Sequence, residues 1–165
     1  MENLEIILED VRKDELCKLV FNEFKITSSE VKDSHFFNRN TKADIEFHEL
    51  ESLWDVFSPV GTGNVLLNQL DLGFSLKNVL IIFSFDKELG NITINFSESE
   101  LFEGENSSVR LKAQKILESL LILKHKFNIP KIRIGFEPAS DDDMCLLEIG
   151  YEAVDLESAV DLLLR

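Results

Sequence analysis

One stretch of the chain indicates the fold more clearly than any other: residues 78–96, which read NVLIIFSFDKELGNITINF. Residues 79–83 form an uninterrupted apolar run, which is typical of a strand covered on both faces. Residues 86–91 form a polar turn, and residues 92–96 then alternate between apolar and polar side chains, as in a half-buried strand. The two segments together predict a β-hairpin.

The segment after this hairpin changes from a two-residue to a helical repeat. Ser107 or Ser108 can cap a helix over residues 108–127, and Asn128 and Pro130 end it. The apolar positions keep a period of 3.6 residues, which predicts an amphipathic helix. These positions are Val109, Ala113, Ile116, Leu117, Leu120 and Leu123.

A second hairpin follows the helix. Its strands lie near residues 132–136 and 144–149, and a PASDDD turn at 138–143 joins them. The order of elements is β-β-α-β-β. We therefore predict a single α+β domain over residues 1–165, with an antiparallel sheet and helices packed on it, including a helical C-terminal segment at 156–165.

The first third of the chain fits two interpretations, both of which include N-terminal helices. Two sets of residues have helical spacing, with a phase shift between them, and fit one long kinked helix: Leu4, Ile7, Leu8 and Val11, then Leu16, Leu19, Val20 and Phe24. The same residues also fit a short strand at 4–8 followed by a helix at 13–25. Residues 27–43 are polar and are predicted to be a loop. Residues 46–57 are predicted to be a helix that Pro59 stops, and its buried stripe would be Phe47, Leu50, Leu53, Trp54 and Phe57.

The charge of the chain restricts its partners. The net charge is −14, from 17 Lys and Arg against 31 Asp and Glu. Nucleic acid and anionic membrane surfaces both require a basic footprint, so neither is expected as a direct partner. The acidity fits a cationic protein partner, and taken alone it fits simple solubility somewhat better. The start of the chain has no basic region before an apolar run, so a cytoplasmic protein is expected.

The residue types that carry catalysis do not form a recognisable arrangement. No GxSxG motif occurs, and His35, His48 and His125 lack the spacing of metal ligands. The glycine-rich segment 58–64 has no lysine to bind phosphate, so it is predicted to be a turn. Cys17 and Cys145 are predicted to be buried free thiols. We expect no catalytic residues, no cofactor and no metal.

Acidic residues concentrate on either side of the predicted helix, whose segment 107–128 is basic because it carries Arg110, Lys112, Lys115, Lys124 and Lys126 against Glu118. The turn residues Asp141, Asp142 and Asp143 fit a solvated tip, a partner contact or, least well, a cation site, because the alternating oxygens and central glycine of a calcium loop are missing. The residues predicted to contact a partner are Glu98, Glu100, Glu103, Glu105, Asp141, Asp142 and Asp143.

The stretch NVLIIFSFDKELGNITINFSESELF, the helix, and then KIRIGFEPASDDDMCLLEIG resemble the small cytosolic immunity proteins of bacterial polymorphic toxin systems, including contact-dependent growth inhibition. The resemblance lies in size, acidity, two hairpins and an acidic turn before the last strand. It implies a protein that binds a toxin domain and neutralises it without catalysis. Such toxins are often basic nucleases, which would account for the acidity.

The leading hypothesis is therefore an immunity protein that occludes the active or substrate-binding face of a cationic toxin domain. Two alternatives stay open. One is an acidic adaptor or chaperone-like module for another basic protein. The other is a small-molecule enzyme or ligand-binding protein, which would have a deep apolar pocket with convergent polar groups.

Overall fold

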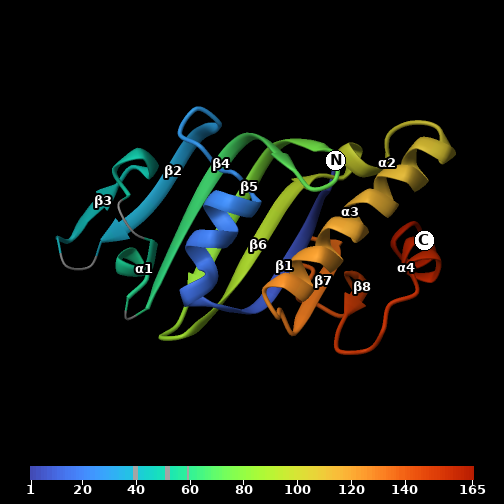
Figure 1. Cartoon of the computed structure of the whole chain (residues 1–165). Helices are drawn as coiled ribbons and strands as arrows, with labels where there is room; N and C mark the ends of the chain where they lie inside the picture. Colours follow the sequence, from blue (N-terminus) through green and yellow to red (C-terminus); the bar gives the residue numbers. More distant parts are fainter. Residues whose placement is uncertain (39–40, 51–52, 59) are drawn as a thin grey trace.

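A computed structural model of the chain describes residues 1–38, 41–50, 53–58 and 60–165. Within these residues, one antiparallel sheet of eight strands runs in the order β3-β2-β4-β5-β6-β1-β7-β8 (Figure 1). The strands are β1 (Asn3–Arg12), β2 (Val31–Asn38), β3 (Ala43–Ile45), β4 (Gly61–Asp71), β5 (Ser75–Phe85), β6 (Leu89–Ser97), β7 (Lys131–Phe136) and β8 (Cys145–Ile149). The helices are α1 (Leu53–Val56), α2 (Glu98–Phe102), α3 (Asn106–Lys126) and α4 (Leu156–Leu163), with the short helical segments η1 (Lys13–Glu15), η2 (Lys18–Glu23) and η3 (Phe47–Glu49).

Both predicted hairpins are present, as are the long helix between them and the C-terminal helix. Strand β5 pairs with β6, and β7 pairs with β8. The β-β-α-β-β core was nevertheless incomplete, because β1 lies between the two hairpins. Ile6 pairs with Ile94 on one side and with Ile134 on the other. The N-terminal strand thus joins the hairpins into one sheet.

A β-bulge explains why the sequence of β1 also fitted a helix. Leu4 and Leu8 are buried on one face, and the register shifts between Leu8 and Val11, where Asp10 has a φ of 55°. The extra residue returns Val11 to the face of Leu8, which produces a three-residue spacing inside a strand. The predicted strand at 4–8 is therefore present as part of β1, whereas the short segments η1 and η2 stand in place of the predicted helix at 13–25. The interpretation as one long kinked helix was wrong.

The predicted loop at 27–43 was also wrong, because it contains β2. Only Phe36 of this strand is fully buried, so its sequence lacks clear alternation. Phe36 packs against the backbone of β4 at Gly63, where an added Cβ would lie 2.4 Å from the ring. A side chain at position 63 would collide with the Phe36 ring, which explains why a glycine occupies this position in the strand. Strand β4 itself begins at Gly61, within the segment that was predicted to be a turn.

The predicted helix at 46–57 is interrupted. It is replaced by η3 and α1, and Leu50 between them has an extended backbone. Phe47, Leu53 and Phe57 of the predicted stripe are buried, and Leu50 is half-buried. Residues 51–52, Pro59 and the side chain of Trp54 lie outside the described part of the chain.

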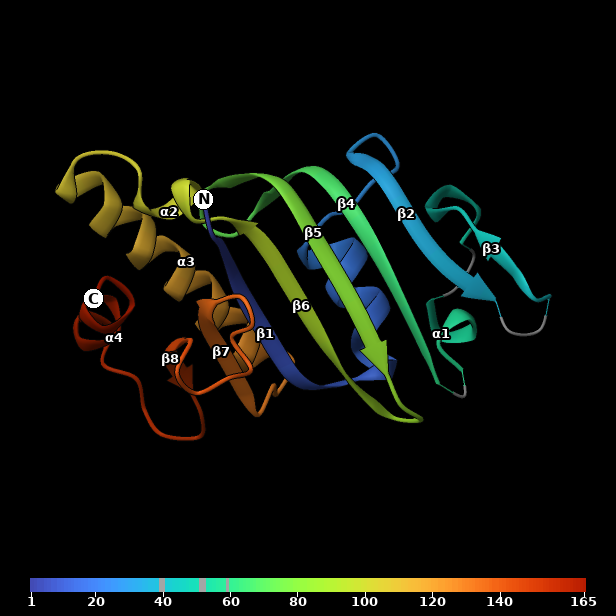
Figure 2. The same cartoon turned by 180° about the vertical axis from the view of Figure 1, so that it is seen from behind.

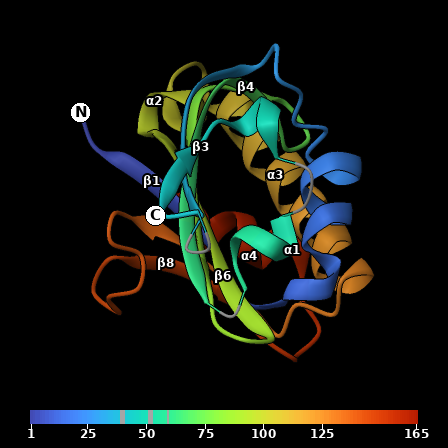
Figure 3. The same cartoon turned by 90° about the vertical axis from the view of Figure 1, so that its left-hand side faces the viewer.

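Most of the helices lie on one face of the sheet. Figure 3 views the sheet nearly edge-on and shows α1, α3 and α4 on the same side. Helix α3 buries Ala113, Ile116, Leu117, Leu120 and Leu123 against the sheet, and Val109 is only half-buried. The helix begins at Asn106 with Glu105 at its N-cap position, so neither Ser107 nor Ser108 is the cap. No helix among the described residues is long and apolar enough to cross a membrane.

The opposite face of the sheet is largely uncovered, as the view from behind shows (Figure 2). The side chains of β5 are buried to different extents on the two faces of the sheet. Val79, Ile81 and Phe83 are buried toward the helices, whereas Leu80 and Ile82 are only partly buried. The prediction that this run is covered on both faces was therefore wrong, because no second layer of helices packs on it in the described residues.

Candidate functional site

The open face of the sheet has an apolar centre. Leu80 and Ile82 of β5 point to this face, and the register places Leu66 of β4 beside Leu80. Ile7 of β1 lies across Thr93 from Ile82. Leu66, Leu80 and Ile82 are partly buried, whereas Ile7 is buried, with only 7% of its surface exposed. A contiguous apolar patch on one face of a protein is typical of an interaction surface.

Polar groups collect at one end of this face, around a hollow of about 460 Å³ between the ends of β5, β6 and β1. Its lining includes Leu80, Asn95, Asn3, Glu100 and Glu137. Asn95 is only 6% exposed. Among the described residues, its Oδ1 atom has no hydrogen-bond partner. The hollow is thus lined by Asn95, by the carboxylates of Glu100 and Glu137, and by the cationic residues Met1 and Lys77.

Glu5 is buried beside this hollow, opposite Asn95 in the β1–β6 register. It is 7% exposed because the β7–β8 connection folds back over the open face, and its Oε2 accepts a 2.7 Å hydrogen bond from the N–H of Ala139. Burial raises the pKa of Glu5, and Glu137 nearby raises it further against the lowering effect of the Ala139 bond. The sequence offered one indication of this buried carboxylate, because Glu5 is the one charged residue in the otherwise apolar segment 4–8.

The predicted acidic residues 98–105 lie in and after α2, at the same end of the sheet. Glu98 accepts a hydrogen bond from the N–H of Glu2 at 3.2 Å, and Glu100 accepts one from the N–H of Lys77 at 3.1 Å. Both carboxylates are half-buried, whereas Glu103 and Glu105 are exposed. Glu98 and Glu100 therefore have local structural roles, and of the four only Glu100 lines the hollow.

The predicted acidic turn 141–143 lies in the β7–β8 connection, which Figure 3 shows on the side of the sheet opposite α3. All three aspartates are exposed. Asp142 forms a 2.6 Å ion pair with Arg133, whose side chain is 11% exposed. This hydrogen bond raises the pKa of Arg133. The arginine supplies the positive charge that three adjacent carboxylates need, and it leaves Asp141 and Asp143 directed to solvent.

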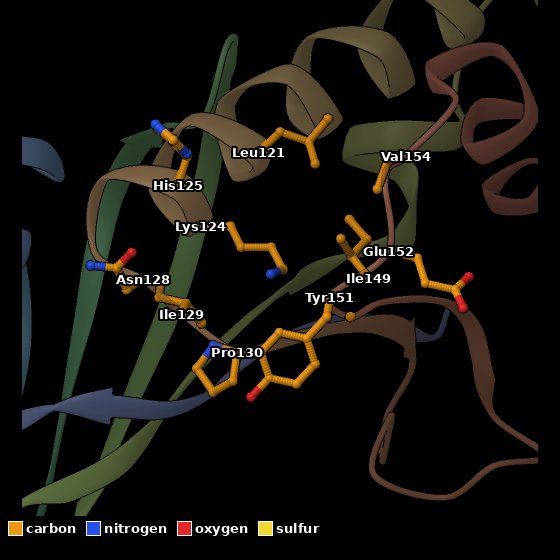
Figure 4. Close-up of a pocket in the computed structure, with 11 residues that line it drawn as sticks. Leu121, Lys124, His125, Asn128, Ile129, Pro130, Ile149, Tyr151, Glu152 and Val154 are labelled. Atoms are coloured by element: carbon orange, nitrogen blue, oxygen red, sulfur yellow. The ribbon is translucent and has the colours of Figure 1, made fainter.

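A second hollow, of about 330 Å³, lies between the C-terminal end of α3, residues 128–130 and residues 149–154 at and after the end of β8 (Figure 4). Leu121, Ile149 and Val154 contribute apolar surface, and Lys124 extends toward the ring of Tyr151, with Nζ 5.8 Å from the ring centroid. Tyr151 is 90% exposed. The hollow therefore does not enclose a ligand as a deep small-molecule pocket would.

Candidate metal ligands do not gather in the described part of the chain, where no group of three or more His, Cys, Asp or Glu side chains could hold an ion. His35 lies 3.6 Å from the carboxylate of Asp44 on the neighbouring strand. The prediction of buried thiols was wrong, because Cys17 is exposed and Cys145 is only partly buried. Cys17 precedes η2 and faces solvent, and Cys145 lies at the start of the edge strand β8.

The model of the family described as PABL017 Cdi1I immunity protein matches residues 2–151. The chain belongs to the Cdi1I immunity protein family. The matched range contains the whole sheet, α2, α3 and the open face, and it ends before α4. Membership of the Cdi1I family confirms the predicted resemblance to immunity proteins, and it makes this chain a binding protein rather than an enzyme.

A solved structure supports the same fold for this Cdi1I-family chain. It is the 1.75 Å crystal structure of the toxic C-terminal tip of CdiA from Pseudomonas aeruginosa in complex with immune protein. A chain of that structure is 18% identical in sequence and superposes with a TM-score of 0.66 over 89% of this chain and 94% of that chain. A comparison with curated proteins returns no match.

Proposed function

We propose that the chain neutralises the C-terminal toxin tip of a CdiA-type protein by binding it in the cytoplasm and occluding its active or substrate-binding face. The observation that carries this proposal is the Cdi1I family match over residues 2–151. The name given to the similar solved complex, a toxic CdiA tip with its immune protein, supports the same pairing.

The surface that binds the tip is the open face of the sheet. Its apolar centre, Leu66, Leu80 and Ile82, supplies area that a partner can bury, because no helix of the described chain covers it. Apolar contacts at the centre of an interface, surrounded by polar groups, are the arrangement that excludes water best. The helical face of the sheet, in contrast, is already filled by the core.

The acidic segments 98–105 and 141–143 attract the tip to this face. We propose that the tip is basic and of nuclease type, since a protein that binds nucleic acid needs cationic side chains. A net charge of −14 on the immunity protein accelerates encounter with such a partner. Exposed acids such as Asp141 and Asp143 contribute to the encounter rate, and the apolar centre controls dissociation.

The experiment is growth of bacteria that express the cognate CdiA-type toxin tip, with and without the chain. We expect growth only when both are present. The purified tip should also lose its activity in a titration that ends at one chain per tip, because occlusion is stoichiometric. Continued growth arrest in the presence of folded chain would overturn the proposal, and so would neutralisation by far less than one chain per tip.

A further inference from the structure

A buried carboxylate and a buried amide are neighbours on the open face. Glu5 of β1 and Asn95 of β6 are paired directly in the sheet register, and both side chains are buried. Directly opposed residues of an antiparallel sheet have Cβ atoms about 4.5–5.5 Å apart, so the polar ends of these two side chains are within reach of each other. Asn95 Oδ1 is enclosed and has no hydrogen-bond partner among the described residues, although buried polar atoms are almost always paired. Because the atom is enclosed, its partner must come from inside the chain.

Glu5 supplies the missing donor when it is protonated. An ionised carboxylate and an amide oxygen are both acceptors, so no hydrogen bond forms between them. One oxygen of Glu5, Oε2, already accepts the N–H of Ala139 at 2.7 Å. A proton on Oε1 adds an O–H donor for Asn95 Oδ1, and the neutral side chain then satisfies both neighbours.

Glu5 lies under the β7–β8 connection, residues 137–144, and helps to hold it on the sheet. Ala139 is fully buried where it donates to Glu5. The N–H of Glu137 donates to the Asn3 carbonyl at 3.1 Å, and Asn3 Nδ2 donates to the Glu137 carboxylate at 3.1 Å. The same connection carries the exposed aspartates of the predicted acidic turn. Lifting the connection from the sheet returns water to the Glu5 carboxylate.

We infer that Glu5 and Asn95 form a proton-operated latch, which fixes the β7–β8 connection over the open face when Glu5 is protonated and releases it when Glu5 is ionised. The latch regulates how this face presents its aspartates to the toxin tip, and this part of the inference rests on the proposed function. Burial raises the pKa of Glu5, the Ala139 bond lowers it and the nearby Glu137 carboxylate raises it, with a net rise. Since an open connection leaves Glu5 in water, protonation favours the closed connection and a rising pH favours the open one.

The cations nearest to Glu5 on the open face are engaged by other carboxylates. Arg133 of β7 is paired with Asp142 at 2.6 Å, and Lys131 is paired with Glu9 at 3.6 Å. Further charged groups line the neighbouring hollow or lie on the connection, and these are the amino terminus, Lys77, Glu100, Glu137, Asp141 and Asp143. Glu5 therefore titrates between an amide, a backbone N–H and a second carboxylate.

The deciding variant is Glu5→Gln, because glutamine has the shape of protonated glutamate. Its NH₂ group can donate to Asn95 while its oxygen accepts the Ala139 N–H. In wild type, the hydrogen-exchange protection factor of the Ala139 amide should fall as the pH rises through the folded pKa of Glu5, by up to tenfold for each unit by which that pKa exceeds its ordinary value. In Glu5→Gln it should stay constant over the same range. Glu9→Gln, the matched change on the same face of β1, should behave like wild type.

Carbon NMR of the Glu5 carboxyl group measures its pKa directly, and Glu5→Gln assigns the resonance. A pKa at or below the ordinary value would overturn the latch, because it would mean that Asn95 turns its Nδ2 donor toward an ionised Glu5. An Ala139 amide that is protected as strongly as the amides of β6 would also overturn it, because the connection would then open only when the whole chain unfolds.

Affinity for the cognate CdiA-type tip tests the regulatory part. Dividing the wild-type affinity by that of Glu5→Gln at each pH cancels the titration of the tip itself. The ratio should be near one at low pH and should fall as the pH rises, by up to the same factor as the Ala139 protection, because only the closed fraction binds fully. A ratio that is constant with pH would overturn the regulation. If neither chain binds the tip at any pH, the proposed function fails, and the exchange and NMR measurements on the free chain still decide the latch.

Discussion

Replacing Ile81 and Ile82 separately by alanine distinguishes the two faces of the sheet. The residues are adjacent in β5 and identical in type, so differences in strand propensity cancel. Ile81 is 0% exposed toward the helices, whereas Ile82 is partly exposed on the open face. Each substitution removes three carbon atoms, which corresponds to about 2.4 kcal/mol of transfer free energy for a side chain that is fully buried.

The two variants should therefore lose different amounts of stability. Ile81→Ala also leaves a cavity in the core, so the free energy of unfolding should fall by about 3–4 kcal/mol. Ile82→Ala leaves no closed cavity and starts from partial hydration, so the loss should be about 1 kcal/mol. Urea denaturation measures both values, and an unchanged dependence on urea concentration would show that the comparison is sound.

Binding should respond in the opposite order. Ile82→Ala should weaken affinity for the toxin tip about tenfold, because an apolar group is lost from the centre of the interface. Ile81→Ala should leave the affinity of the folded protein within about threefold of wild type, because its side chain faces the helices. Equal losses of stability at the two positions would refute the reasoning, since they would mean that both faces of β5 are covered in solution.

Three further predictions follow from the same structure. Leu120→Ala in α3 should lower the free energy of unfolding by about 2–5 kcal/mol in urea denaturation, because Leu120 is fully buried; a loss below about 1 kcal/mol would contradict its place in the core. Reversal of the aspartates at 141–143 to lysine should slow association with the tip by about tenfold and reduce its salt dependence, and an unchanged rate would mean that the acidity serves only solubility. Because the pKa of Glu5 is raised in the folded chain, the folded chain binds a proton at Glu5 at a higher pH than the unfolded chain does. The stability of wild type relative to Glu5→Gln should therefore rise as the pH falls through the folded pKa of Glu5 toward its ordinary value. A stability difference that stays constant with pH in urea denaturation would contradict this prediction.

The parts of the fold that were predicted correctly depend on local patterns. A short turn joins β5 to β6, and the connection at 137–144 joins β7 to β8. Helix α3 has a regular apolar repeat. Each of these patterns is complete within a short segment of the chain. The position of β1 could not be read in this way, because its partners β6 and β7 lie far away in sequence and its bulge imitates helical spacing.

The strands on the other side of the sheet were missed for a different reason. Strand β2 buries only Phe36 completely, so its residues look like a polar loop until β4 is placed beside it. Strand β4 begins within the glycine-rich segment 58–64, which was predicted to be a turn, and Gly63 in this strand leaves room for the ring of Phe36. Burial that depends on a distant segment leaves little trace in the local pattern.

The sequence predicted that the candidate site is acidic, but it did not predict which side chains form the site. Counting acids identified 98–105 and 141–143, but the structure gives Glu98 and Glu100 local hydrogen bonds and pairs Asp142 with Arg133. Asn95 was read simply as the polar position of a half-buried strand. Its burial comes from the arrangement of three strands and the connection above them, which the local sequence does not specify.

The central claim, that the open face of the sheet contacts the toxin tip, is tested most directly by thiol labelling in the complex. In a background with serine at Cys17 and Cys145, one variant carries Thr93→Cys at the centre of the open face and the other carries Leu111→Cys on the exposed side of α3. We expect the bound tip to slow labelling at position 93 by about tenfold or more and to leave labelling at position 111 unchanged, because only the open face is covered. Slower labelling at position 111 with an unchanged rate at position 93 would contradict the account and place the tip on the helical side.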